Sequence, residues 1–112
     1  GVPTLLLTVT GRKSGALRRT ALIYGRIGDD YVIVASKGGH PVNPLWYENL
    51  VANKEVTLQV GAEVFQAHAQ TMPEDADRET AWNTMVGIWP DFANYQVKTE
   101  RRIPLVRLTQ IS

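Results

Sequence analysis

EVTLQVGAEVFQAHAQT, residues 55–71, carries the clearest strand pattern in the chain. Apolar and polar residues alternate on either side of Gly61 and Ala62, which supply a tight turn. This alternation is typical of two antiparallel strands, residues 55–60 and 63–71, that bury one face and expose the other. The residues expected on the buried face are Val56, Leu58, Val60 and Val64.

Four more strands are predicted around this hairpin. They cover residues 5–10, 18–27, 31–35 and 103–108, which are rich in apolar or β-branched side chains. Gly28, Asp29 and Asp30 form a strong turn signal between the second and third of them. Six strands without alternating βαβ units favour an α+β fold built on an antiparallel, barrel-like sheet.

Prolines mark the helices. Asn43 and Pro44 predict a short helix over residues 44–52, with Asn43 as its cap and Pro44 at its first position. Pro73 and the acids after it predict a second helix. Its expected apolar face is formed by Trp82, Met85, Val86 and Trp89. The proline that follows interrupts this helix, and a further helical turn is expected over residues 92–98.

The composition bounds the class of protein. At 112 residues there is room for one domain, residues 1–112, around one core. The chain holds no cysteine, which excludes disulfides and thiolate chemistry and fits a reducing cytoplasm. No apolar run approaches the length of a membrane span. The chain begins at Gly1 rather than methionine, and we expect that an upstream segment was removed.

Charge is distributed unevenly along the chain. The first 28 residues carry five cations and no acid, whereas the rest carry seven cations and all eleven acids. The five cations are Arg12, Lys13, Arg18, Arg19 and Arg26. A positive field concentrated in one part of the chain favours an anionic ligand.

GRKSGALR, residues 11–18, is the strongest candidate site, and we call it the basic turn. Its glycines allow backbone N–H groups to approach a ligand, while Arg12, Lys13 and Arg18 supply charge on both flanks. Arginine offers two parallel hydrogen bonds to a phosphate, and lysine adds a point charge. The alternative is a turn that is merely solvated. A Walker loop is excluded, because its Gly-Lys-Ser/Thr element and the following helix are missing.

Two weaker candidates lie further along the chain. Ser36 and Lys37, where a strand runs into a glycine loop, could read the polar edge of a planar ring. Trp46 and Tyr47 beside a helix start are more typical of core packing than of a ligand platform. Asn49 on the same short, apolar helix would need hydrogen-bond partners if it is buried.

Side chains for conventional catalysis are scarce. Trp89, Phe92 and Tyr95 either close the core or form one wall of a pocket for a flat substrate. His40 lies in the glycine loop without a nearby acid, and His68 is expected at the surface. No metal-ligand cluster and no Ser-His-Asp spacing is present. An enzyme with this sequence therefore needs a cofactor to carry its chemistry.

Three motifs in order resemble the deazaflavin-dependent nitroreductase family of actinobacteria: LLLTVTGRKSG (residues 5–15), VASKGG (34–39) and NPLWYENL (43–50). The similarity continues through residues 89–95 and 102–104, so it spans essentially the whole chain. The resemblance implies a split β-barrel of the flavin-binding type with two or three helices. It also implies coenzyme F-420, an 8-hydroxy-5-deazaflavin with a phosphate and a polyglutamate tail.

The resemblance further implies roles for individual residues. It assigns the phosphate end of the cofactor to Arg12, Lys13, Ser14 and Arg18. It places around the deazaflavin Arg19, Thr20, Ala21, Leu22, Ile23, Val34, Ala35, Ser36 and Lys37. Contacts from the helix would come from Leu45, Trp46, Tyr47, Glu48 and Asn49. The residues facing substrate would be Trp89, Phe92 and Tyr95.

The implied reaction is hydride transfer from reduced F-420 to a small conjugated acceptor: a quinone, an enone or a nitro compound. It needs little from side chains beyond fixing the ring and excluding water. The proton that completes the reduction comes either from solvent or from a pocket hydroxyl, for which Tyr95 is our candidate. The nitroreductase carries tyrosines where this chain has Trp89 and Phe92. Quinones and other conjugated carbonyl compounds are therefore favoured over nitroimidazoles.

Two alternatives stay open. One is an FMN-dependent reductase on the same fold. The other is a small β-barrel that binds nucleic acid through the basic turn, which is disfavoured by the net charge of only +1 and by aromatic residues not interleaved with cations. We expect a cytoplasmic monomer or homodimer, with any membrane association depending on the upstream segment.

Overall fold

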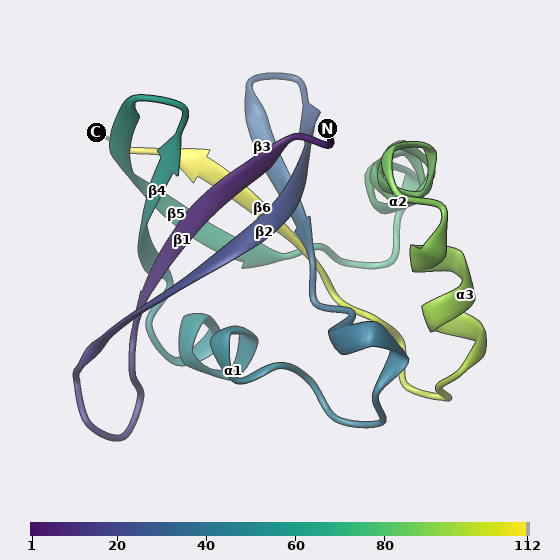
Figure 1. The fold of residues 1–112 in the computed structure, drawn as a ribbon, viewed down its shortest axis with the longest axis horizontal. Coiled ribbons are helices and arrows are strands. Elements are labelled where there is room, and N and C mark those ends of the chain that lie inside the picture. Colours follow the sequence, from purple (N-terminus) through teal and green to yellow (C-terminus); the bar gives the residue numbers. More distant parts are fainter. Residues whose placement is uncertain (112) are drawn as a thin grey trace.

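The computed structural model describes residues 1–111, whose six strands form a closed β-barrel (Figure 1). The strands are β1 (Thr4–Thr10), β2 (Leu17–Ile27), β3 (Asp30–Val34), β4 (Glu55–Val60), β5 (Glu63–Thr71) and β6 (Leu105–Gln110). Their order around the barrel is β1-β2-β3-β6-β5-β4, and all neighbours are antiparallel. The helices are α1 (Leu45–Ala52), α2 (Ala76–Ile88) and α3 (Asp91–Val97), with a short 3-10 turn, η1 (Lys37–Gly39). The predicted α+β barrel is confirmed.

The hairpin of β4 and β5 has the predicted bounds, but one residue faces the other way. The turn pairs Val60 with Glu63, so Val64 lies opposite Gln59 on the outer face and is 63% exposed. The expectation that Val64 is buried was therefore wrong. The residues of β5 that face the barrel interior are Phe65, Ala67 and Ala69.

Apolar side chains pack in two clusters, one inside the barrel and one between its outer wall and the helices α2 and α3. On β3, Tyr31 and Ile33 belong to the inner cluster, whereas Val32 and Val34 belong to the outer one. Burial on both faces explains why this strand is continuously apolar. On β2, a Cβ at Gly25 would lie 2.6 Å from the sulfur of Met85, so the missing side chain lets α2 approach the barrel closely.

The start of α1 differs from the prediction. Pro44, not Asn43, is the N-cap, and it makes no side-chain capping bond. The Asn43 side chain instead accepts a hydrogen bond from Nη1 of Arg101 at 2.9 Å. The side-chain oxygen that we expected to cap the helix therefore bonds to an arginine that is distant in the sequence.

The later elements are placed correctly, with small shifts. α2 begins after Asp75, whose carboxylate caps it, and ends at Ile88, so Trp89 follows the helix instead of lying on its face. α3 confirms the helical turn expected after the proline. β6 begins two residues later than predicted, at Leu105, although Ile103 is fully buried.

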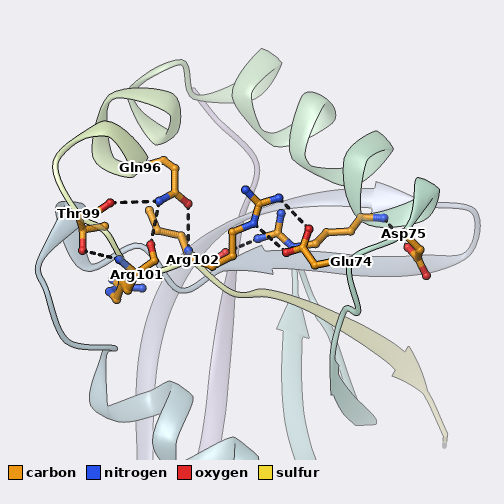
Figure 2. A network of polar contacts seen from close by, with 8 residues as sticks. Glu74, Asp75, Gln96, Thr99, Arg101 and Arg102 are labelled. Atoms are coloured by element: carbon orange, nitrogen blue, oxygen red, sulfur yellow. Dashed lines mark hydrogen bonds and ion pairs between the residues drawn. The ribbon is translucent and has the colours of Figure 1, made fainter.

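A buried arginine joins α2 to the chain that enters β6. Arg78 is 4% exposed and donates from Nη2 to the carbonyl of Ile103. Its Nε lies 3.5 Å from Glu74, which also accepts two hydrogen bonds from Arg102, at 2.8 and 2.9 Å (Figure 2). The hydrogen bond from Arg102 is the main reason that the pKa of Glu74 lies below its ordinary value.

In the part of the chain described, no helix has the length and apolarity needed to cross a membrane.

We predict that Leu7→Ala destabilises the barrel by about 2–5 kcal/mol, because the Leu7 side chain is fully buried in the inner cluster. Leu17→Ala is the matched control, since Leu17 is 72% exposed and its loss should change stability by less than about 0.5 kcal/mol. Urea unfolding followed by circular dichroism measures both. Equal effects of the two changes would contradict the packing described.

Candidate functional site

The basic turn folds back on itself between β1 and β2. The N–H of Gly11 donates to the carbonyl of Ala16 at 2.8 Å, and that of Gly15 donates to the carbonyl of Gly11 at 2.9 Å. The N–H of Ala16 donates to Oγ of Ser14 at 3.2 Å. Both glycine N–H groups are thus used within the turn, not left for a ligand as we expected. Within residues 1–111, the N–H groups of Lys13 and Ser14 have no protein acceptor.

Asn49 on α1 holds the turn in place. Its Oδ1 accepts two hydrogen bonds from Arg12, one from the backbone N–H and one from Nη1, both at 3.1 Å. The Asn49 side chain is 5% exposed, so these bonds supply the partners that a buried amide needs. The turn and the helix thereby form one site.

A pocket of about 300 Å³ lies between the basic turn and α1. Its lining residues are Gly11, Arg12, Lys13, Ser14, Arg18, Leu45 and Asn49. All four residues assigned to the phosphate end therefore line the same pocket as Leu45 and Asn49, two of the residues assigned to the helix. Arg12, Lys13 and Arg18 are exposed, and none of them forms an ion pair with a carboxylate in the part of the chain described. Their charge is available to an anion.

The side chains along β2 divide between two faces. Arg18, Thr20 and Leu22 share the inward face with the β1 residues they pair with. Arg19, Ala21 and Ile23 lie on the outer face, where Ile23 joins the outer cluster. Residues 19–23, which we expected to border the deazaflavin together, therefore lie on two opposite faces of the sheet.

Arg26 lies apart from the basic turn. It belongs to the far end of β2, where its guanidinium lies 4.1 Å from the ring centroid of Tyr31 and donates to the carbonyls of Asp29 and Asp30. Of the five early cations, four therefore belong to the basic turn and the start of β2.

The first half of β2 has an open edge. β3 pairs with β2 only from Tyr24 onward, so within residues 1–111 the segment 17–23 has β1 on one side and no paired strand on the other. The N–H of Tyr24 donates to the carbonyl of Pro3, beyond the start of β1. Because the direction of backbone groups alternates along a strand, the N–H and C=O groups of Arg19, Ala21 and Ile23 face the open side. They offer a row of alternating donors and acceptors.

A second group of predicted residues lies at η1 and α3, across α1 from the basic turn (Figure 1). Ala35 is fully buried and its N–H donates to the carbonyl of Pro104 at 2.9 Å, so it is not available to a ligand. Ser36 is half-buried and Lys37 is exposed. A Cβ at Gly39 would lie 2.6 Å from a backbone atom of α3, so η1 and α3 are in direct contact rather than joined by a loose loop.

The three aromatic residues differ in burial. Phe92 is 6% exposed and belongs to the outer cluster, which favours the core-packing alternative for it. Trp89 and Tyr95 are half-buried. Nε1 of Trp89 donates to the Tyr95 hydroxyl at 3.4 Å, and the Lys98 ammonium lies 5.8 Å from the Tyr95 ring centroid.

Other candidates face the barrel or the solvent. Trp46 and Tyr47 pack against the inner cluster, as the core-packing reading predicted, and the Tyr47 hydroxyl shares a 2.8 Å hydrogen bond with Thr71. Val34 is also buried, and Glu48 is half-buried. Both histidines, His40 and His68, are exposed. Across residues 1–111, no group of His, Cys, Asp and Glu is arranged to hold a metal ion.

Comparison with known proteins places this geometry in a family. The family described as F-420H(2)-dependent quinone reductase matches residues 1–110. The chain belongs to this family. An F-420H(2)-dependent quinone reductase of Mycobacterium tuberculosis is 44% identical over 110 residues, which cover 96% of this chain and 74% of that protein. The resemblance recognised from the motifs is thereby confirmed.

Solved structures agree. An F-420-H2-dependent reductase has a TM-score of 0.86 at 40% identity, covering 95% of this chain and 93% of its own. A chain described as a domain-swapped dimer has the same score and identity and is covered to 79%. A haem storage protein of Vibrio cholerae, 15% identical with a TM-score of 0.75, shares the fold. The barrel is the split β-barrel that the resemblance implied.

We predict that Asn49→Ala loosens the basic turn, because it leaves the Arg12 N–H without its buried acceptor. Stability should fall by about 1–3 kcal/mol in urea unfolding, the cost of an unsatisfied buried group. Amide hydrogen exchange in residues 11–18 should become faster. Asn53→Ala is the control, because Asn53 is exposed and makes only a 3.5 Å contact with the carbonyl of Thr10. Unchanged hydrogen exchange in the Asn49 variant would show that the basic turn keeps its conformation without Asn49.

Proposed function

We propose that this chain is an F-420-dependent reductase that passes a hydride to a quinone or a related conjugated acceptor. The observation that carries the proposal is the acid-free basic pocket beside an open strand edge, in a member of this reductase family. The reduced deazaflavin supplies the hydride when it is bound. The protein's part is to bind, orient and exclude water.

The phosphate end fits the basic pocket. Arg12, Lys13 and Arg18 supply three unpaired positive charges around about 300 Å³ of space. The N–H groups of Lys13 and Ser14 add two donors that the protein itself does not use. Charge-assisted hydrogen bonds of this kind are among the strongest in proteins.

The ring fits the open edge of β2. The pyrimidine edge of a deazaflavin alternates carbonyl acceptors with an N–H donor, and the free backbone groups of Arg19, Ala21 and Ile23 alternate in the same way. Backbone hydrogen bonds along a strand edge are a common mode of recognition. We assign Ser36 and Lys37 to the same end of the cofactor, and Leu45 and Asn49 to the phosphate end.

The substrate side consists of Trp89 and Tyr95. Since the Trp89 indole donates to the Tyr95 hydroxyl, the oxygen acts as acceptor there and its own proton is free to point elsewhere. This arrangement supports Tyr95 as the donor of the proton that completes the reduction. Phe92 contributes by packing edge-to-face with the Tyr95 ring, with the ring centroids 6.1 Å apart.

The alternatives are weaker. Nucleic acid is disfavoured because Arg26 lies apart from the other early cations, which leaves a small basic surface. FMN shares the ring edge and the phosphate, so only a binding comparison separates it from F-420. As a 40%-identical chain is described as a domain-swapped dimer, we favour a homodimer over a monomer.

We predict that oxidised F-420 binds and that FMN does not, in a fluorescence titration of the purified chain. Reduced F-420 should then be oxidised on adding a soluble naphthoquinone, as followed by absorbance. Arg12→Ala combined with Lys13→Ala should weaken F-420 binding by roughly 2–4 kcal/mol, because charge-assisted bonds are lost. Arg26→Ala is the matched control and should leave affinity unchanged. FMN binding without F-420 binding would overturn the proposal.

We also predict that Tyr95→Phe lowers kcat for quinone reduction by at least about tenfold, since positioned proton transfer contributes on the order of 10²–10⁴-fold and water replaces part of it. The dissociation constant of F-420 should stay within about twofold, because the change removes only the hydroxyl. Trp89→Phe, which removes the indole donor, should lower kcat less. An unchanged kcat in Tyr95→Phe would mean that the proton comes from solvent.

A further inference from the structure

The segment of residues 35–43, which we call the cofactor loop, lacks strong support of its own. Its internal hydrogen bonds run from the N–H of Gly39 to Ser36, from that of His40 to Lys37, and from that of Val42 to the His40 ring. Lys37 has φ 45°, the only positive φ at a non-glycine residue in the part described. Such a conformation is strained and persists only where the surroundings hold it.

Arg101, between α3 and β6, provides that support. Its guanidinium donates four hydrogen bonds to the cofactor loop and none to any other part of residues 1–111. Nε reaches the carbonyl of His40 at 2.8 Å, and Nη2 reaches that of Ser36 at 2.6 Å. Nη1 reaches the carbonyl of Ala35 at 3.1 Å and Oδ1 of Asn43 at 2.9 Å. The bonds reach both ends of the loop and flank Lys37.

Among the described residues, no carboxylate pairs with the charge of Arg101. The salt bridges found within residues 1–111 involve Arg78, Arg102 and Arg107, and all four acceptors of Arg101 are neutral oxygens. Burial lowers the pKa of Arg101, which reflects the cost of desolvating the cation. Arg101 is half-buried, and neutral oxygens rather than a carboxylate satisfy its donors. Its field favours an anionic ligand at the cofactor loop.

Arg101 is itself fixed to α3. Gln96 on α3 donates from Nε2 to the carbonyl of Arg101 at 2.8 Å, and its Oε1 accepts from the N–H of Ile103 at 3.0 Å (Figure 2). The Arg101 N–H donates to Thr99 at 3.3 Å. The same helix carries Tyr95, the candidate proton donor. Arg101 thus adds a second connection between the cofactor loop and the substrate side, beside the direct contact of Gly39 with α3.

We propose that Arg101 is a positioning residue, which holds the cofactor loop against α3 so that Ser36 and Lys37 keep the conformation that F-420 binding requires. The proposal rests on the proposed function and extends it, because it names how the cofactor end and the substrate end of the site are kept in register. Arg101 acts through the loop and needs no contact with the cofactor.

The test compares Arg101→Gln and Arg101→Lys with Arg102→Gln. Arg102 is the adjacent arginine, exposed and paired with Glu74, so it is a matched control. Fluorescence titration with oxidised F-420 should show at least a tenfold loss of affinity in Arg101→Gln and a smaller loss in Arg101→Lys, since lysine cannot reproduce the planar fork of donors. Arg102→Gln should stay within twofold of the natural chain.

Amide hydrogen exchange gives a readout that does not depend on activity. In Arg101→Gln, exchange within residues 36–40 should become faster while peptides from β1, β4 and β5 stay unchanged. If exchange and affinity both match the natural chain, Arg101 does not position the loop. If exchange rises while affinity stays within twofold, the loop conformation does not matter for binding. Either result overturns the proposal.

A milder variant covers the case in which Arg101→Gln does not fold. Asn43→Ala removes one of the four acceptors of Arg101 and should weaken F-420 binding by about threefold. Unchanged affinity in that variant would also overturn the proposal. Absence of F-420 binding by the natural chain would instead reject the proposed function, so the two failures are distinguishable.

Discussion

The whole structure depends on the burial of β3 and β6 on both of their faces. Tyr31 and Ile33 fill the barrel, while Val32 and Val34 on the same strand need cover from outside. Each such side chain contributes about 1.5–3 kcal/mol when it is fully buried. The helices α2 and α3 supply that cover, so the chain must leave the barrel after β5 and return to enter β6. That return brings Arg101 beneath the cofactor loop.

The two halves of the site are held in the same physical way. At one end a buried amide, Asn49, accepts hydrogen bonds from Arg12 and fixes the basic turn. At the other end a partly buried guanidinium, Arg101, donates to the cofactor loop. In both cases a side chain from elsewhere in the fold satisfies backbone groups of a segment that connects two elements. A preorganised site avoids the cost of ordering those segments when a ligand binds.

Much of this arrangement could be predicted from local pattern. β4 and β5 have the bounds that alternation indicated, and the other strands are displaced by one or two residues at their ends. Local sequence pattern did not predict the structure correctly where a group distant in the sequence formed the contact instead. The oxygen of Asn43 bonds to Arg101 instead of capping a helix, and the turn register exposes Val64. Phe92 joins the outer cluster because α3 folds against the barrel.

The amino-acid sequence was sufficient to predict the strand pattern, the family and the positive charge of the first 28 residues. Those follow from residue type and spacing, and an acid-free stretch of 28 residues stays positive in any fold. Which cations lie together, and which arginine bonds to residues 35–43, depends on how the chain folds. Arg26 was separated from the basic turn by the length of β2. Arg101 and Arg102 are adjacent and chemically identical, and only packing turned one toward the cofactor loop and the other toward Glu74.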